Sequence, residues 1–504
     1  MRELAPYLIA ILIPIIYRLV LPATILDDAY ITMRTARNLS LGNGMVFNLG
    51  ERVFTVTTVL WTMLNALPRV FGLDSIASIW ILGLLSEMAL AAVLVRIGKS
   101  IFDSRWIGTL SAAFLMTNPV FLISSLGGME LPLSLCAIAS AFLLLHEKRT
   151  TGALLISAIA VWIRVDNLLL LSIIGLWCIL DKDRRGRLRD YIPAAVVVAV
   201  YLIATWIYYG IPLPVSVLRK AAFPETTLWR VGALRNLTEF AWSIAGKFGT
   251  YSLGKLPYLI VPLLVIVGIY SAIKSEKRQL LPLATFTIAY ILAFVISGKT
   301  YATLFPWYFA PPLLLAALIA ASGLDRLFAE TMRSKTVRIA AIAVAAVLWA
   351  AIMFPFDKSD ATEYRDEIMA GREKVYASTT LWLESNFPGR LRICTGEIGA
   401  IGFFADDETK VVDMVGLTRP PGDNRLPVQL VIEERVEAII YWLFRGQEYN
   451  DIAPHYPNYE WGQVGDVLIG FRADLAGELL PKSPQLMEIY EEIDMNAEYR
   501  PGSE

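Results

Sequence analysis

The 504-residue chain is 56% hydrophobic and 18% charged, and its mean hydropathy is +0.54. Because the apolar residues come in blocks, this composition excludes a soluble protein and predicts a polytopic α-helical membrane protein. The formal net charge of −1 gives no electrostatic reason to expect nucleic acid as a partner, and two histidines are too few for a histidine-based metal site.

Eleven apolar segments predict about eleven membrane helices. The short segments around residues 157 and 174 are typical of helices that pack inside a bundle. Loops rich in Lys and Arg follow alternate segments, which predicts a cytoplasmic N-terminus and a multi-pass protein of the cell membrane. The segments are approximately residues 4–22, 76–95, 106–123, 131–145, 152–163, 168–180, 191–209, 256–273, 279–297, 307–323 and 337–355.

The stretch from Thr24 to Thr58 follows the first apolar segment and contains two adjacent carboxylates, Asp27 and Asp28. Such a pair at the edge of a bilayer is unfavourable unless it is partnered or lines a wet cavity. Arg34 and Arg37 follow at helical spacing, so we expect a short amphipathic helix on the membrane surface. A structural alternative is that the aspartates only cap this helix.

With the predicted orientation, the polar residues near the outer ends of the segments lie at a similar depth. The region 210–255 is expected to be an outer loop. The predicted cytoplasmic loops are too short to form a functional site on the cytoplasmic side of the membrane. The outer candidates beyond the aspartates are Glu130, Arg164, Asp166, Lys220 and Lys299.

Residues 356–504 are expected to form an extracytoplasmic α/β domain, separate from a membrane domain of residues 1–355. Charged residues become frequent there and no segment could span a bilayer. Short buried strands are predicted in R-L-R-I-C-T, K-V-V-D-M-V, E-A-I-I-Y-W-L and G-D-V-L-I-G-F, with helices over 361–387 and 427–436.

Several motifs together resemble the GT-C fold glycosyltransferases, and most of all the bacterial arabinofuranosyltransferase and mannosyltransferase-like membrane proteins. The main block is L-D-D-A-Y-I-T, R-T-A-R-N-L, G-N-G-M-V-F-N-L-G-E-R-V and T-T-V-L-W-T. Weaker matches are G-G-M-E-L-P, I-R-V-D-N and I-P-L-P-V-S-V-L-R-K. The family often has R-P-E-G at the second of these, where this chain has Val165 and Asp166 in place of Pro and Glu.

The resemblance implies transfer of a sugar from a polyprenyl-phosphate donor to an extracytoplasmic glycan, lipid or protein acceptor. Phosphate is already a good leaving group, so one Asp base and cations for the phosphate suffice, and a single displacement inverts the anomeric centre. Asp28 or Asp27 is the candidate base. Arg164, Lys220 and Lys299 are candidates for the phosphate, whereas Glu130, Asp166, Arg34 and Arg37 are candidates for substrate contacts or for orienting a carboxylate.

Two questions stay open at this point. No cofactor is certain, although a divalent metal on the aspartate pair would suit hard oxygen ligands. A non-catalytic or transport protein of the cell envelope is the alternative function. Transporters usually show repeated halves and charges near the bilayer midplane, and neither is evident in this sequence.

Overall fold

The computed structural model divides the chain into two compact units, each assembled from three segments of sequence. The first unit comprises Met1–Ala23, Ile81–Tyr201 and Pro224–Thr362, and the second comprises Thr24–Trp80, Leu202–Phe223 and Glu363–Glu504. The residues that the structure describes are 3–22, 24–181, 186–222, 229–245, 259–274, 278–297, 306–368, 372–387, 391–443, 449–464 and 466–475.

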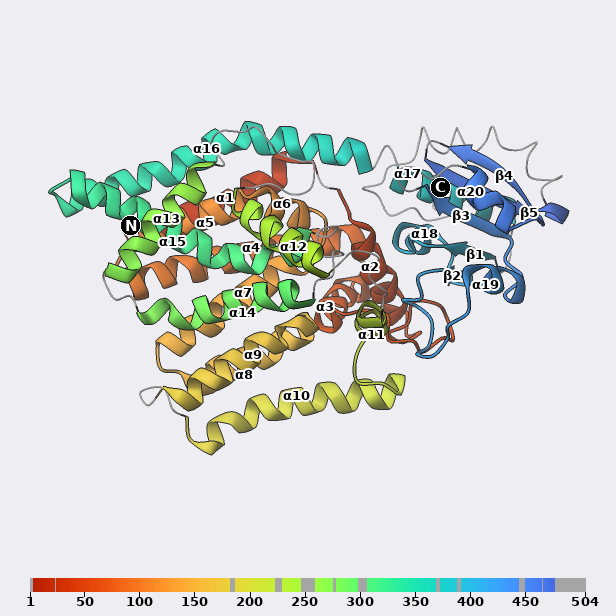
Figure 1. Ribbon diagram of the computed structural model, residues 1–504, viewed down its shortest axis with the longest axis horizontal. Coiled ribbons are helices and arrows are strands. Elements are labelled where there is room, and N and C mark those ends of the chain that lie inside the picture. The colour runs from red at the N-terminus through yellow and green to blue at the C-terminus, as the bar shows by residue number, and fades with distance from the viewer. Residues whose placement is uncertain are drawn as a thin grey trace. The chain divides into compact units, whose positions relative to one another are not determined.

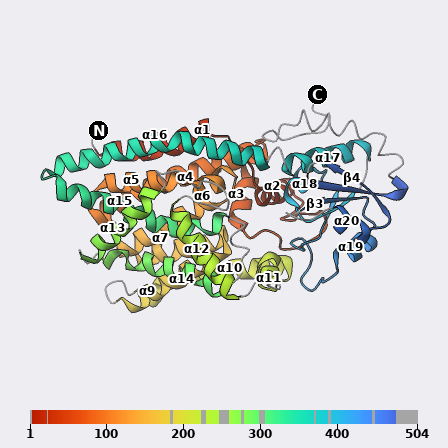
Figure 2. The same cartoon turned by 45° about the horizontal axis from the view of Figure 1, so that its top comes forward.

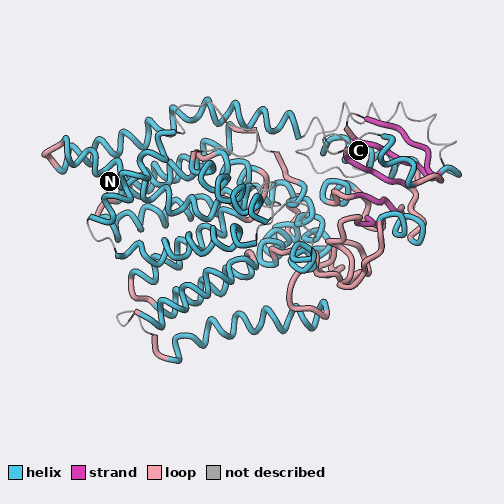
Figure 3. The backbone as a smooth tube through the Cα atoms, in the orientation of Figure 1, coloured by secondary structure: helices cyan, strands magenta, loops and turns pink. Residues whose placement is uncertain are grey.

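The described part of the first unit is helical, and the strands occur only in the second unit (Figure 3). The helices α4, α10 and α16 have residues in both units. The helices with residues in the first unit are α1 (Ala5–Val20), α4 (Ser75–Phe102), α5 (Arg105–Met116), α6 (Pro119–Leu126), α7 (Leu131–His146), α8 (Thr150–Ile163), the 3₁₀ helix η1 (Val165–Asn167), α9 (Leu168–Leu180), α10 (Leu188–Tyr209), α12 (Trp229–Ile244), α13 (Ile260–Lys274), η3 (Arg278–Leu280), α14 (Leu281–Ser297), η5 (Pro306–Tyr308), α15 (Ala310–Thr331) and α16 (Lys335–Ile368).

Each of the eleven apolar segments coincides with one of these helices or with the bent pair α5 and α6. Among the described residues, 5 helices are long and apolar enough to cross a membrane, or 6 if the bent pair forms one span. Five further apolar helices are shorter, namely those beginning at Ala5, Leu131, Thr150, Val165 and Ile260. The chain is therefore a multi-pass membrane protein by composition, and the count of eleven spans stays a prediction.

The third apolar segment is broken by a bend of 71° between α5 and α6. Proline kinks or breaks a helix because it lacks the N–H group and its ring clashes with the preceding turn, but it is favoured at a helix start. Asn118 precedes Pro119 and its side chain accepts a hydrogen bond from the backbone N–H of Val120 at 3.0 Å. The Asn-Pro pair therefore ends one helix and starts the next.

Glycines allow helices of the first unit to approach closely. A Cβ on Gly98 of α4 would lie 2.3 Å from the backbone nitrogen of Gly108 of α5. Gly268 and Gly323 bring α13 and α15 together in the same way, since a Cβ on Gly268 would lie 2.0 Å from the carbonyl oxygen of Ile319. Such small residues are typical of helix crossings within membranes. The pair α13 and α15 lies side by side in both views (Figure 1, Figure 2), and α7, α8, α9 and α14 pack in succession.

Two expectations about organisation differ from the structure. The region 210–255, expected as a loop, contains α11 (Val215–Ala222) and α12. The helix α16 continues through Pro355 to Ile368, past the predicted domain boundary, because a helix satisfies its own backbone wherever its surroundings change from apolar to polar. Residues 24–80 belong to the compact unit that holds the sheet. Independent folding of residues 356–504 stays a prediction.

The second unit contains a mixed five-stranded sheet with the order β2-β1-β3-β5-β4. The strand β1 is parallel to β2 and β3, whereas β5 is antiparallel to β3 and β4. The four predicted strand segments are confirmed, and β4 was not expected. The elements are α2 (Asp27–Ser40), α3 (Val59–Val70), α11, α17 (Lys374–Asn386), β1 (Arg392–Thr395), α18 (Gly399–Phe404), β2 (Lys410–Asp413), α19 (Pro427–Glu433), β3 (Ala438–Trp442), α20 (Tyr449–Ile452), η7 (Ala453–His455), β4 (Tyr459–Val464) and β5 (Val467–Arg472).

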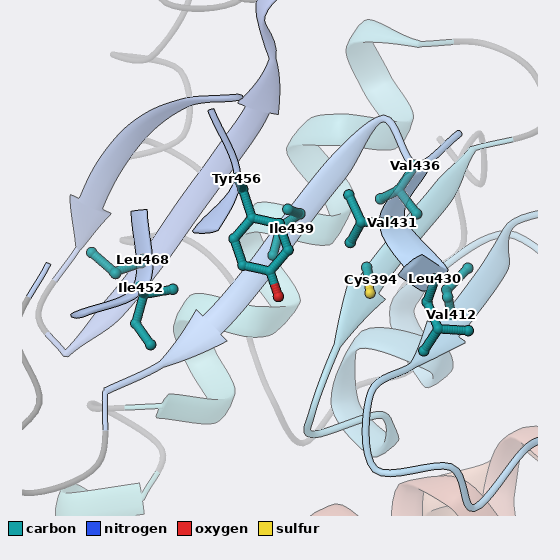
Figure 4. Packing of buried hydrophobic residues seen from close by; sticks show 9 residues of the cluster. All are labelled: Cys394, Val412, Leu430, Val431, Val436, Ile439, Ile452, Tyr456 and Leu468. Carbon is teal, nitrogen blue, oxygen red and sulfur yellow. The ribbon is translucent and has the colours of Figure 1, made fainter. Parts of the chain in front are cut away.

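Apolar side chains of neighbouring strands meet in register on one face of this sheet. Cys394 pairs with Val412 of β2 and with Ile439 of β3. Leu430 and other residues of the α19 region cover them (Figure 4). The full cluster is Cys394, Val412, Leu430, Val431, Val436, Ile439, Ile452, Tyr456 and Leu468.

The helix α2 is buried on nearly all sides within the second unit, which corrects the expectation of a one-sided surface helix. Tyr30, Met33 and Arg34 are each 0% exposed. The helix packs against both α3 and α18, so two partners cover two faces. The sequence of α2 shows one polar face, and a polar face is normally read as exposed to solvent. It does not reveal that another helix, α18, packs against that face.

Candidate functional site

The helix α2 begins with the two aspartates singled out in the sequence. Leu26 is the N-cap residue and its side chain makes no capping hydrogen bond, so Asp27 and Asp28 occupy the first turn. Asp27 is buried, whereas Asp28 is half-buried. The two adjacent carboxylates therefore have different environments, and neither serves as the N-cap of its own helix.

Asp27 caps a different helix. Its Oδ2 accepts a hydrogen bond from the backbone N–H of Gly399 at 3.0 Å, and its Oδ1 accepts one from Ala400 at 2.9 Å. Both donors belong to the first turn of α18, where backbone N–H groups have no partner within the helix. Asp27 thus joins the start of α2 to the start of α18.

The close approach of these two helices depends on glycine. A Cβ on Gly399 would lie 1.9 Å from the backbone oxygen of Asp27 and 2.6 Å from its Cγ. A Cβ on Gly402, one turn later, would lie 2.4 Å from the ring of Phe47. The two glycines, one helical turn apart, therefore leave the face of α18 that meets α2 without side chains at these positions.

Arg34 fixes the same contact further along α2. Its guanidinium donates to three backbone carbonyl groups, those of Phe47 at 2.8 Å, Thr409 at 2.9 Å and Gly402. Arg37 donates to the carbonyl groups of Phe403 and Ala405, and it pairs with Asp407 at 2.9 Å. These contacts hold the helices together. Substrate contacts by either arginine stay a prediction.

A group of charged side chains surrounds Asp27 in the second unit. Arg372 pairs with Glu373 and, at 3.3 Å, with Glu397, and it lies over the ring of Trp442 at 5.0 Å from the ring centre. Burial raises the pKa of Asp27 above its ordinary value, while Arg372 and the two backbone N–H groups act in the opposite direction. Sequence reasoning did not single out this group; Glu397 stands directly before residues 398–404, which include α18.

A second polar cluster lies in the first unit, where the apolar helices α8 and α9 are interrupted. Arg164 pairs with Glu130 at 2.5 Å and with Asp166 at 2.9 Å, so it joins two residues that the sequence indicated as candidates. Tyr290 donates a hydrogen bond to Asp166 at 3.3 Å, and the guanidinium lies 5.6 Å from the ring centre of Tyr308. With one arginine and two carboxylates, the three charged groups sum to about −1 when ionised.

The first unit also contains a buried ion pair that sequence reasoning did not single out. Arg18 of α1 pairs with Glu87 of α4 at 2.6 Å, and it donates to the side chain of Ser125 at 2.9 Å. The signal was present, because each charge stands alone in an apolar segment, where ionisable residues are rare unless they are paired.

The remaining candidates cannot all be placed. Lys220 lies in α11, but its side chain is outside the described residues, and Lys299 lies outside them entirely. The neighbouring Arg219 donates to the carbonyl oxygen of Asp423 at 2.6 Å. In the part of the chain that the structure describes, no three His, Cys, Asp or Glu side chains are placed to hold a metal ion.

Comparison with known proteins identifies relatives of one kind. The chain is 29% identical over 290 residues to a terminal β-(1→2)-arabinofuranosyltransferase of Corynebacterium glutamicum. The aligned region covers 51% of this chain and 40% of that protein. It is 58% identical over 40 residues to the protein of the same description in Mycobacterium tuberculosis, and this aligned region covers 8% of this chain and 6% of that protein. The matched regions thus span less than half of these relatives. No family model matches the chain.

The fold has a solved counterpart in ArnT from Cupriavidus metallidurans bound to undecaprenyl phosphate. The TM-score is 0.57 at 12% sequence identity, and the match covers 93% of this chain and 97% of that one. At this identity the match establishes the fold alone. The GT-C fold expected from the sequence motifs is confirmed.

Proposed function

We propose that this chain, a sequence relative of terminal arabinofuranosyltransferases with the GT-C fold, is a membrane glycosyltransferase that uses a polyprenyl-phosphate sugar. Support comes from the homology and from the ArnT fold, whose solved example holds undecaprenyl phosphate. The name of the relative favours a pentose as the transferred sugar. A glycan is the acceptor best supported by this homology, with a lipid or protein as alternatives.

The single observation that carries the mechanism is the difference in hydrogen bonding and burial between the two aspartates. Asp27 directs both carboxylate oxygens to backbone N–H groups of α18, whereas Asp28 stays half-buried. We therefore assign the base to Asp28. It accepts the proton of the acceptor hydroxyl while the new bond from that oxygen to the anomeric carbon forms. The bond to the phosphate oxygen breaks, the phosphate leaves with the electron pair, and the configuration inverts.

The cations that hold the phosphate are proposed from charge balance. Arg164 is already paired with two carboxylates, so we expect it to organise Glu130 and Asp166 for hydrogen bonds to sugar hydroxyl groups. Lys220 and Lys299 remain the proposed phosphate contacts, since a negative leaving group is stabilised by positioned cations.

The reaction is tested with purified protein and a panel of polyprenyl-phosphate pentoses and hexoses, followed by mass spectrometry of the products. We expect transfer from a pentose donor and little from hexoses, because a pocket shaped for the smaller sugar excludes the larger one. Transfer from hexose donors alone would reject the pentose, and failure of all donors with a range of acceptors would reject the proposed activity.

We also propose that the N-terminus is cytoplasmic and that the chain after residue 360 lies outside. The alternation of cationic loops supports this orientation. Reporter fusions after residues 185 and 360 should report opposite sides of the membrane. Reports from the same side would reject the eleven-span count, and reports of residue 185 outside with residue 360 inside would reject the orientation.

A further inference from the structure

The strand order β2-β1-β3 singles out one edge of the sheet in the second unit. The chain passes from β1 to β2 on one side of β1 and then returns to β3 on the other side, and all three strands are parallel. Because crossovers between parallel strands are right-handed, these two connections leave the sheet on opposite faces. Open α/β sheets bind ligands outside the carboxyl ends of the strands at such a reversal. In this sheet the reversal lies at the carboxyl ends of β1 and β3.

Charged and aromatic side chains meet at this edge. Thr395 ends β1, and its Oγ1 accepts a hydrogen bond from the backbone N–H of Glu397 at 3.3 Å, whereas Trp442 ends β3. Arg372 joins the two strand ends, because its guanidinium donates to Glu397 at 3.3 Å and lies 5.0 Å from the ring centre of Trp442. Its Nε also donates to the buried carboxylate of Glu373 at 3.0 Å, so three contacts fix the guanidinium.

These side chains suit a neutral ligand that is rich in hydroxyl groups. The side chains of Arg372 and Glu397 are 22% and 32% exposed, so both can contact a ligand. A guanidinium donates hydrogen bonds and a carboxylate accepts them, whereas a hydroxyl group does both. The half-buried Trp442 adds apolar surface for the C–H groups of a sugar ring. Two carboxylates against one guanidinium leave an excess of negative charge, which disfavours a phosphate.

The same side chains lie close to the proposed base within the second unit. Glu397 stands two residues before Gly399, and two residues span at most about 7 Å. The backbone N–H of Gly399 donates to Oδ2 of Asp27 at 3.0 Å, and Asp28 follows in the first turn of α2. A glycan held at Glu397 can therefore bring a hydroxyl group of a neighbouring sugar unit to Asp28.

We propose that Glu397, Arg372 and Trp442 form a subsite for the acceptor glycan, which holds a sugar unit close to the one that is glycosylated. This inference rests on the proposed function, because it names where the acceptor of that reaction is bound. Arg372 donates to sugar hydroxyl groups and Glu397 accepts from them. The subsite contributes to binding of the acceptor and takes no proton in the reaction.

The test compares Glu397→Ala and Arg372→Lys in the full-length protein with matched controls at the opposite edge of the sheet. Glu437 directly precedes β3 and pairs with Arg472 of β5, also at 3.3 Å. Glu437→Ala and Arg472→Lys therefore make the same chemical changes away from the subsite. Alanine removes the exposed carboxylate, whereas lysine keeps the charge beside Glu373 and loses the planar fork of the guanidinium.

Binding is measured by isothermal titration with a linear arabinofuranose tetrasaccharide in the absence of a donor. We expect the Kd to rise roughly 10- to 100-fold in both subsite variants, the effect of losing a hydrogen bond to a charged group, and to keep the parent value in both controls. In transfer assays the KM for the tetrasaccharide should rise by a similar factor, while the KM for the polyprenyl-phosphate donor stays unchanged. Melting temperatures verify folding, and Glu397→Ala decides alone if Arg372→Lys does not fold.

The outcomes separate this proposal from the proposed function. Parent-like binding of the tetrasaccharide by folded Glu397→Ala would reject the subsite. A raised KM for the donor with an unchanged KM for the acceptor would also reject it, because the side chains would then contact the donor sugar. If the parent binds the tetrasaccharide and Glu397→Ala does not, but the parent transfers no sugar, the proposed function fails and the glycan site stands. If the parent transfers sugar and all four variants bind and react like it, the subsite fails and the proposed function stands.

Discussion

Asp28→Asn is expected to lower the rate of sugar transfer by roughly 100- to 10,000-fold, the usual contribution of a general base. The amide has nearly the same shape as the carboxylate but cannot accept the proton of the acceptor hydroxyl. Asp28 is half-buried in the first turn of α2, so the substitution should leave the fold intact. The measurement is kcat with a polyprenyl-phosphate donor, alongside the melting temperature.

Asp27→Asn is the matched control, because it makes the same chemical change one residue earlier. An amide offers a single acceptor oxygen, whereas Asp27 accepts hydrogen bonds through both oxygens. One backbone N–H of α18 would then face an NH₂ group, at a cost of about 1–3 kcal/mol for a buried unsatisfied donor. We expect a lower melting temperature and a smaller loss of rate than for Asp28→Asn. Parent-like transfer by a folded Asp28→Asn protein would remove Asp28 as the base.

Gly399→Ala is expected to separate α18 from α2 and to abolish most of the activity. The added Cβ would lie 1.9 Å from the backbone oxygen of Asp27, a distance that requires backbone movement. Moving α18 would break the hydrogen bonds from Gly399 and Ala400 to Asp27. Overpacking of this kind destabilises a protein by about 1–3 kcal/mol.

Gly396→Ala provides the control for that change. It lies three residues earlier, and the nearest atom to its added Cβ would be Cγ2 of Val415 at 4.0 Å, an ordinary contact. We expect parent-like melting temperature and transfer for this variant. If Gly399→Ala melts and reacts like Gly396→Ala, the tight contact between α18 and Asp27 does not exist in the working protein.

The elements of this chain follow largely from local sequence. An apolar segment of about 20 residues forms a helix because its backbone must be satisfied internally in the membrane, whatever its neighbours are. The short apolar strands after residue 390 were predicted for a similar reason, since their pattern and length are local properties. Adjacent carboxylates directly after an apolar segment were sufficient to single out Asp27 and Asp28.

Partners of charged side chains were decided by the tertiary structure alone. Asp27 bonds to Gly399, 372 positions away, and Arg34 donates to the carbonyl group of Thr409, 375 positions away. A sequence shows that a buried charge needs compensation, but it does not show whether a ligand or the backbone provides it. For this reason the sequence did not show that Arg34 and Arg37 donate to backbone carbonyl groups of α18, and their contacts with substrate stay a prediction.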